Sequence, residues 1–273
     1  MLKTRVISAL VGLALLVAAL YMGSLFLGII VCAIAAIGLH EFYSSVEKAN
    51  FKPIKLVGYL SIIPLLLLVF NYAKIIDLDM AKVTAVSAFI LIVLCMAVIV
   101  FANKKHNIID ACITIFGVAY IPFTLSFVIT IRNLDFGIIL IWLIFIGAWG
   151  TDTMAYTCGR LFGKRKILPE ISPKKTLGGA VGGAIGCLLL MMAFGYIVEV
   201  YFGLKMSYVA LAIVGLFCGI VSQVGDWCAS AIKRYVNIKD FGNIMPGHGG
   251  VIDRFDSILF VAPTVYFLLT SFI

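Results

Sequence analysis

The sequence predicts an all-α membrane protein with about nine transmembrane helices, from its composition, its long apolar runs and the distribution of its basic residues. Hydrophobic residues make up 63% of the 273 residues and charged residues only 12%, and the mean hydropathy is +1.15. A soluble domain of this length needs a more charged surface. Runs of about 18 or more apolar residues recur along the chain, and each can cross a bilayer core of roughly 30 Å. A soluble protein is therefore excluded.

The expected spans cover the whole chain, so one membrane-embedded domain, 1–273, accounts for it. Lys3 and Arg5 precede the first apolar run, as in a signal peptide, but no clear small-residue cleavage site follows. We therefore expect the first span to be retained and to form a tight hairpin with the second. The nine spans are Ile7–Met22, Leu25–Leu39, Leu56–Tyr72, Val83–Phe101, Ala111–Ile131, Phe136–Cys158, Gly178–Tyr201, Tyr208–Cys228 and Asp253–Ile273.

The basic residues predict a cytoplasmic N-terminus. In that orientation 17 of the 21 Lys and Arg residues lie on the cytoplasmic side, as the positive-inside rule requires. The four on the opposite side are Lys74, Lys82, Arg132 and Lys205. The same bias explains the formal charge of +8 through cytoplasmic loops and anionic lipid, so no nucleic-acid partner is expected. Short loops and compact length favour a bacterial inner membrane.

Four carboxylates lie at the expected cytoplasmic ends of spans. Asp152 and Asp226 are near the inner ends of the sixth and eighth spans, and Asp253 and Asp256 share one face at the start of the ninth. Ionised groups in a span cost roughly 2.5–3.5 kcal/mol, so they need a reason. The structural alternatives are helix capping by Asp253 and an ion pair of Asp256 with Arg254 or with a neighbouring basic loop. Together, however, these oxygen donors predict a Mg²⁺ site completed by substrate phosphate.

Two polar segments on the same side have features of phosphate sites. Ser172, Lys174 and Lys175 directly precede a span, and a helix N-terminus with basic residues suits phosphate. A basic cluster that serves topology or binds anionic lipid is the alternative. The second segment is the glycine-rich turn Pro246–Gly250, whose backbone N–H groups could approach phosphate oxygens. His248 in that turn is either a phosphate donor or a turn residue.

Gly178, Gly182 and Gly186 have GxxxG spacing in the seventh span, which indicates close helix packing. The spacing leaves open whether this face packs within one chain or between two copies, so a homodimer stays an alternative. Several catalytic motifs are absent from the sequence: His40-Glu41 does not continue to HExxH, and neither a Walker A motif nor GxSxG occurs.

The polar segment Ser230–Asp256 resembles the signature of the phosphatidate cytidylyltransferase family. It reads Ser230-Ala231-Ile232-Lys233-Arg234, then Lys239-Asp240, then Pro246-Gly247-His248-Gly249-Gly250-Val251-Ile252-Asp253-Arg254-Phe255-Asp256. The segments Asp152–Tyr156 and Ser172–Thr176 are similar to that family as well. Met245 and Leu177 depart from the residue types expected beside these motifs, at positions that should not affect the chemistry.

The resemblance implies an enzyme that transfers the CMP moiety of CTP to phosphatidic acid, giving CDP-diacylglycerol and pyrophosphate for phospholipid biosynthesis. It implies that Asp226 and Asp253 bind the divalent cation and that Lys174 is an important loop lysine. We assign Mg²⁺ to these two aspartates, alone or beside a second cation, and expect Asp256 to support them. The residues then expected to bind substrate are Asp152, Ser172, Lys175, Lys233, Arg234, His248, Gly249, Gly250 and Arg254.

Two other functions remain as alternatives at this point. Another CTP-using lipid enzyme, such as a polyprenol kinase, would transfer the γ-phosphoryl group to an alcohol and should lack the signature. An ion or phosphate transporter would also place Asp residues and glycine-rich helices in the membrane. Polar residues gathered on one side, without a clear inverted repeat, count against the transporter.

Overall fold

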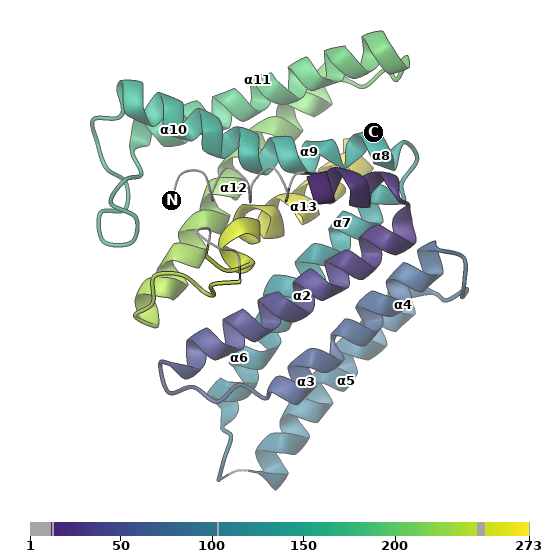
Figure 1. Cartoon of the computed structure of the whole chain (residues 1–273), viewed down its shortest axis with the longest axis vertical. Coiled ribbons are helices and arrows are strands. Elements are labelled where there is room, and N and C mark those ends of the chain that lie inside the picture. The colour runs from purple at the N-terminus through teal and green to yellow at the C-terminus, as the bar shows by residue number, and fades with distance from the viewer. Residues whose placement is uncertain (1–11, 13, 103, 245–248, 273) are drawn as a thin grey trace. The chain divides into compact units, whose positions relative to one another are not determined.

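The computed structural model describes residues 12, 14–102, 104–244 and 249–272, and in this part of the chain the regular elements are helices (Figure 1). Eight helical segments among them are long and apolar enough to cross a membrane. The prediction of an all-α, multi-pass membrane protein is thereby confirmed.

Several of the eight spans consist of consecutive helical pieces. The single-piece spans are α2 (Ser24–Glu47), α5 (Met80–Phe101), α11 (Leu177–Phe202), α12 (Tyr208–Tyr235) and α13 (Ile252–Phe272). The composite spans are α3 (Lys55–Leu60) with α4 (Ile62–Tyr72), α6 (Ile108–Val118) with η1 (Ala119–Phe123) and α7 (Thr124–Arg132), and α8 (Gly137–Leu140) with α9 (Trp142–Phe145), η2 (Ile146–Gly150) and α10 (Thr151–Phe162). The π-helical turn η1 contains Pro122, which has no N–H to continue the regular ladder.

The first expected span, Ile7–Met22, is only partly described, and of its described residues 12 and 14–21 are helical. The other eight are present, and two of them continue at least seven residues beyond the end that hydropathy predicts. The second continues to Glu47 and the eighth to Tyr235. Both extensions contain charged residues, which a hydropathy window rejects, but the backbone continues the helix through them. Both extensions also contain residues of the candidate site described below.

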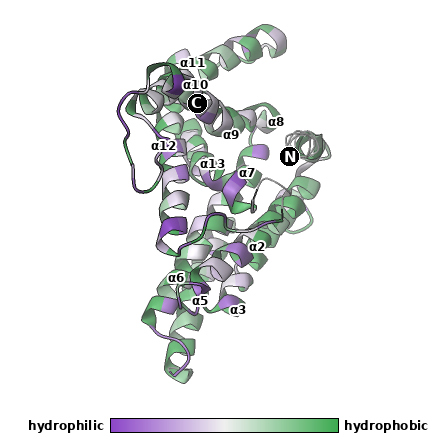
Figure 2. Cartoon of the chain, turned by 60° about the vertical axis from the view of Figure 1, so that its left-hand side comes forward, coloured by the Kyte–Doolittle hydropathy of each residue, from purple (hydrophilic) through white to green (hydrophobic). Residues whose placement is uncertain are grey.

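Contacts divide the chain into two compact units. The first unit falls within Met1–Ile129 and Lys233–Arg254, and the second within Thr130–Ile232 and Phe255–Ile273. The single-domain organisation expected from the sequence stays a prediction. Figure 2 shows that hydrophobic residues predominate along the helices, whereas the loop between α10 and α11 is largely hydrophilic.

In the first unit, α2, α4 and α5 run alongside one another (Figure 1). Tyr43 of α2 is fully buried, and its hydroxyl donates to the Thr114 carbonyl at 3.0 Å. The nearby carboxylate of Asp110 accepts from the backbone N–H groups of Lys52, at 2.7 Å, and Asn107, at 3.0 Å. Asp110 therefore joins a loop to the start of α6 and is satisfied as a structural residue.

In the second unit, α10 packs along the glycine face of α11 (Figure 1). A Cβ atom added to Gly186 would lie 2.6 Å from Cβ and Cγ of Met154, and one added to Gly183 would lie 2.9 Å from Cβ of Ala155. The GxxxG spacing is therefore accounted for by close packing within one chain. Association of two copies through another surface stays a prediction.

We expect Gly186→Leu to destabilise the protein by about 1–3 kcal/mol, because the added side chain would overlap the Met154 stem next to the α10 backbone. Thermal unfolding in detergent measures this change. Val181→Leu, at a half-exposed position of the same helix, is the control and should leave the unfolding temperature unchanged. Equal stability of the two variants would contradict the close packing of this face.

Candidate active site

In the second unit, three of the predicted carboxylates surround one lysine. Lys175 Nζ lies 2.7 Å from Asp226 Oδ2. Burial lowers the pKa of Lys175, but the charge and hydrogen bond of Asp226, followed by the charges of Asp152 and Asp256, outweigh it and raise that pKa. Lys175 is consequently a protonated ammonium group at neutral pH, held in a negatively charged site.

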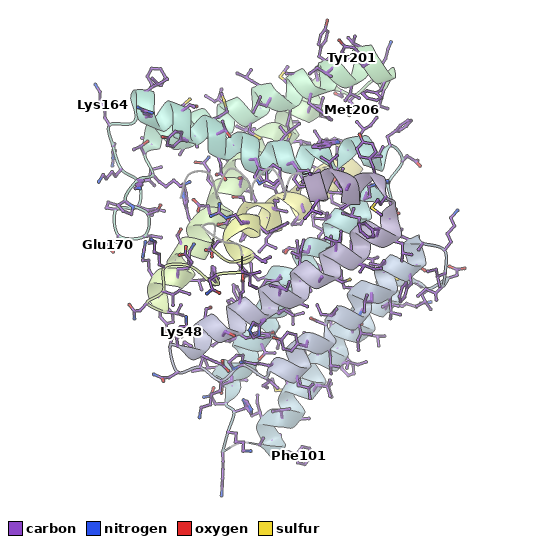
Figure 3. The ribbon with its side chains drawn as sticks, viewed as in Figure 1. Lys48, Phe101, Lys164, Glu170, Tyr201 and Met206 are labelled. Carbon is purple, nitrogen blue, oxygen red and sulfur yellow. The ribbon has the colours of Figure 1, made fainter. Side chains whose placement is uncertain are left out.

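The loop between α10 and α11 fixes the position of Lys175. It folds back on itself: the Ile167 N–H donates to the Lys175 carbonyl at 3.1 Å, and the Leu177 N–H donates to the Arg165 carbonyl at 2.8 Å. Thr176 then caps α11 through the Gly179 N–H at 3.2 Å. Figure 3 shows Lys164 next to the end of α10 and Glu170 at the far end of this loop. The backbone of Lys175 is therefore fixed by the hydrogen bonds at the base of the loop and by the capped start of α11.

The donors of this cluster suit a hard cation that also binds phosphate. Asp152 Oδ1 is buried and has no hydrogen-bond partner among the described residues. Among all the residues that the structure describes, no three His, Cys, Asp or Glu side chains are arranged to hold a metal by themselves. Mg²⁺ is usually held by one or two carboxylates together with water and substrate phosphate. The carboxylates present therefore fit Mg²⁺ only as part of a shell that substrate completes.

In the first unit, Asp253 joins the start of α13 to the end of α12. Lys233 Nζ lies 2.7 Å from Asp253 Oδ1. Oδ2 accepts from the Phe241 N–H at 2.8 Å and from the Gly250 N–H at 3.0 Å. The side chain is only 4% exposed. Asp253 thus holds the backbone of the signature segment, and its Oδ1 is paired with Lys233.

Glu41 is a buried carboxylate that sequence reasoning missed. It is 3% exposed and accepts from the backbone N–H groups of Val251, at 2.9 Å, and Ile252, at 3.0 Å. The sequence interpretation ended the second span at Leu39, which placed Glu41 in a loop, and considered it only as part of an incomplete HExxH motif. An ionisable residue next to an apolar run was the signal that could have found it.

The other predicted residues occupy less enclosed positions. Lys174 is exposed and Ser172 is half-buried in the α10–α11 loop, and Arg254 is exposed on the first turn of α13.

A pocket in the first unit is lined by Arg234, Asn237, Ile238 and Lys239, so that its lining includes two cationic residues and one amide. Gly249 has a φ of 87°, a left-handed conformation that favours glycine. His248 lies outside the described residues, as do Pro246 and Gly247.

Both residues that the resemblance assigned to the metal are therefore paired with lysines, one in each unit. The residues around Lys175 form the second-unit cluster, and those around Asp253 form the first-unit cluster. Two helices contribute residues to both clusters. Asp226 and Lys233 are in α12, and Asp253 and Asp256 are in α13. The assignment of the metal to Asp226 and Asp253 stays a prediction.

Comparison with known proteins identifies the family. The sequence model of the cytidylyltransferase family matches residues 3–272. The chain belongs to the cytidylyltransferase family. This cytidylyltransferase is 35% identical over 274 residues to the phosphatidate cytidylyltransferase of Bacillus subtilis, with 98% of this chain and 96% of that protein covered. It is 32% identical to the enzymes of the same name from Staphylococcus saprophyticus, over 270 residues, and Staphylococcus aureus, over 267 residues, with 98% of each chain covered in both cases.

The comparisons confirm the resemblance read from the signature segment, because the match extends over nearly the whole cytidylyltransferase. They also confirm that the chain is a nucleotidyltransferase enzyme. A transporter is not favoured, because the matched family and the relatives above are transferases by name.

We expect Lys175→Met to destabilise the cytidylyltransferase by about 1–3 kcal/mol, because the substitution leaves the partly buried Asp226 without its ammonium partner. Chemical unfolding in detergent measures the loss. Adding Asp226→Asn to this variant should recover part of it, as in a double-mutant cycle.

The matched control is Lys82→Met, which removes an ion pair between strongly exposed side chains, Lys82 and Asp79. It should change stability little, since exposed pairs contribute between about 0 and 1 kcal/mol. Additive single-mutant effects at Lys175 and Asp226 would contradict direct coupling between these two residues.

Proposed function

We propose that this cytidylyltransferase transfers the CMP moiety of CTP to phosphatidic acid, giving CDP-diacylglycerol and pyrophosphate for phospholipid biosynthesis. The observation that carries the proposal is the match to phosphatidate cytidylyltransferases along nearly the full length of both chains. The carboxylate–lysine clusters support it, because a reaction between two polyanions needs cations held in defined positions.

The chemistry needs no covalent intermediate and no strong general base. The phosphate of the lipid is already an anionic nucleophile. One of its oxygens attacks the α-phosphorus of CTP, the bond from that phosphorus to the bridging oxygen of the β-phosphate breaks, and pyrophosphate leaves with the electron pair. The protein must bring two polyanions together and stabilise the charge that builds on the leaving pyrophosphate.

Basic side chains of both clusters supply that stabilisation. Lys175 and Lys233 neutralise carboxylates in this structure, and each can exchange its carboxylate partner for a phosphate oxygen. The exposed side chains of Lys174 and Arg254, and Arg234 with Lys239 at the pocket, add positive charge for the nucleotide and the lipid phosphate.

Asp226 and Asp253 would hold Mg²⁺, alone or beside a second cation, with Asp256 supporting them. When bound, Mg²⁺ neutralises charge on the phosphates and orients them. Asp152, whose buried Oδ1 has no hydrogen-bond partner among the described residues, is the further oxygen donor of the second-unit cluster.

The expected location is a bacterial inner membrane, with the reacting residues on the cytoplasmic side. The bias of basic residues toward that side supports the orientation. A reaction at the membrane edge keeps the diacyl tails in lipid while CTP arrives from water. The multi-pass helices are consistent with this arrangement.

The direct test uses purified protein with radiolabelled CTP, phosphatidic acid and Mg²⁺, and follows labelled CDP-lipid and pyrophosphate. We expect both products in equal amounts. A polyprenol kinase would instead release CDP and phosphorylate a polyprenol. If phosphatidic acid gave no labelled lipid across several detergents and divalent metals, the proposal would be wrong.

We expect Asp226→Asn to lower kcat by about 100-fold or more, the scale on which a single preorganised electrostatic contact contributes to catalysis. The amide is similar in size but has no charge to hold a cation or to orient Lys175. Asp79→Asn, at an exposed position, is the control and should keep the wild-type rate. Near-normal activity of a folded Asp226→Asn protein would refute the metal assignment.

Lys174→Ala should separate activity from stability. Its side chain is exposed, so we expect the variant to unfold at the wild-type temperature while kcat/KM falls by about 10-fold or more through loss of a phosphate contact. Lys48→Ala, at an exposed lysine just beyond the end of α2 (Figure 3), is the control. Wild-type kcat/KM in Lys174→Ala would remove this lysine from the site.

A further inference from the structure

Glu41 is a carboxylate buried in an apolar chain without an ion-pair partner among the described residues. It lies in the last two turns of α2 and is 3% exposed. Burying a charge is costly unless hydrogen bonds replace its water. Here the Val251 and Ile252 N–H groups supply them, one to each carboxylate oxygen, at 2.9 Å and 3.0 Å.

The donors that Glu41 satisfies belong to the start of α13. The first N–H groups of a helix have no partner within the helix and carry its partial positive charge. The three consecutive N–H groups that lead into α13 are accepted by two carboxylates: Gly250 by Asp253 Oδ2, and Val251 and Ile252 by Glu41. Glu41 and Asp253, which are more than 200 residues apart in sequence, therefore bind N–H groups of the same backbone segment, residues 250–252.

The glycines beside Glu41 show that its carboxylate fills a shaped space. A Cβ atom added to Gly250 would lie 2.6 Å from both Glu41 oxygens, and one added to Gly242 would overlap Oε1. Any side chain at these positions would push the carboxylate away from the N–H groups of α13. The absence of a Cβ at both positions thus permits the contact.

We propose that Glu41 is a positioning residue for the cytidylyl transfer: by holding the Val251 and Ile252 N–H groups, it fixes the first turn of α13 and with it the carboxylate of Asp253. Both hydrogen bonds of Glu41 go to the backbone of the signature segment, so its effect on the reaction would pass through Asp253. This inference rests on the proposed function for its effect on the reaction, whereas its effect on the backbone can be measured without it.

The test is Glu41→Gln, which keeps the shape of the side chain. The amide offers only one acceptor oxygen, and its NH₂ group would face a backbone N–H. Hydrogen–deuterium exchange on the metal-free, substrate-free protein should then be on the order of 10-fold faster at residues 250–253, while α6 keeps its protection. In the assay, kcat should fall by about 10- to 100-fold, the effect of losing a residue that orients a ligand, with KM for CTP unchanged within about twofold.

Glu47→Gln is the matched control, because Glu47 is in the same helix but forms an exposed ion pair with Lys55. It should leave both exchange and kcat unchanged. Wild-type exchange at residues 250–253 in Glu41→Gln, or faster exchange with wild-type kcat, would overturn the proposal. So would loss of protection throughout the first unit, since that indicates a general structural role. If the wild-type protein made no CDP-lipid, the proposed function would fail, whereas the exchange result would still test the contact.

Discussion

A buried carboxylate in an apolar, membrane-spanning chain is costly without a partner, and this constraint accounts for most of the contacts in the candidate site. Asp226 forms an ion pair with Lys175. Asp253 forms one with Lys233 and accepts hydrogen bonds from two backbone N–H groups, and Glu41 accepts hydrogen bonds from two other backbone N–H groups. Each of these carboxylates, in a helix, binds a residue of a loop, and Asp253 and Glu41 also join two helices. The loops that contain polar residues are therefore held in place by the same groups that give the site its charge.

These pairings also suit a reaction of polyanions. A lysine that neutralises a carboxylate is already desolvated and oriented, so contact with a phosphate oxygen replaces one anion by another and creates no unpaired charge. The raised pKa of Lys175 keeps its ammonium group charged for this exchange. A family that transfers cytidylyl groups needs such positioned cations more than it needs a nucleophilic side chain or a strong base.

Much of the fold and part of the site could be predicted from the amino-acid sequence. Hydropathy located eight spans that the structure contains, because membrane crossing depends on the composition of a continuous segment. It ended two of them seven or more residues too early, because a hydropathy window excludes charged residues whose partners are distant in sequence. Glu41 was missed for that reason: its donors at Val251 and Ile252 are about 210 residues away in sequence.

The sequence by itself determined the class of protein, most of the helices, the family and the set of acidic and basic residues from which a site could be built. Only the tertiary structure decided the pairing: that Lys175 rather than Lys174 meets Asp226, and that Glu41 holds the start of α13. The reason is physical. Hydropathy and motif spacing are properties of neighbouring residues, whereas the partner of a buried charge depends on how distant loops and helix ends fold together.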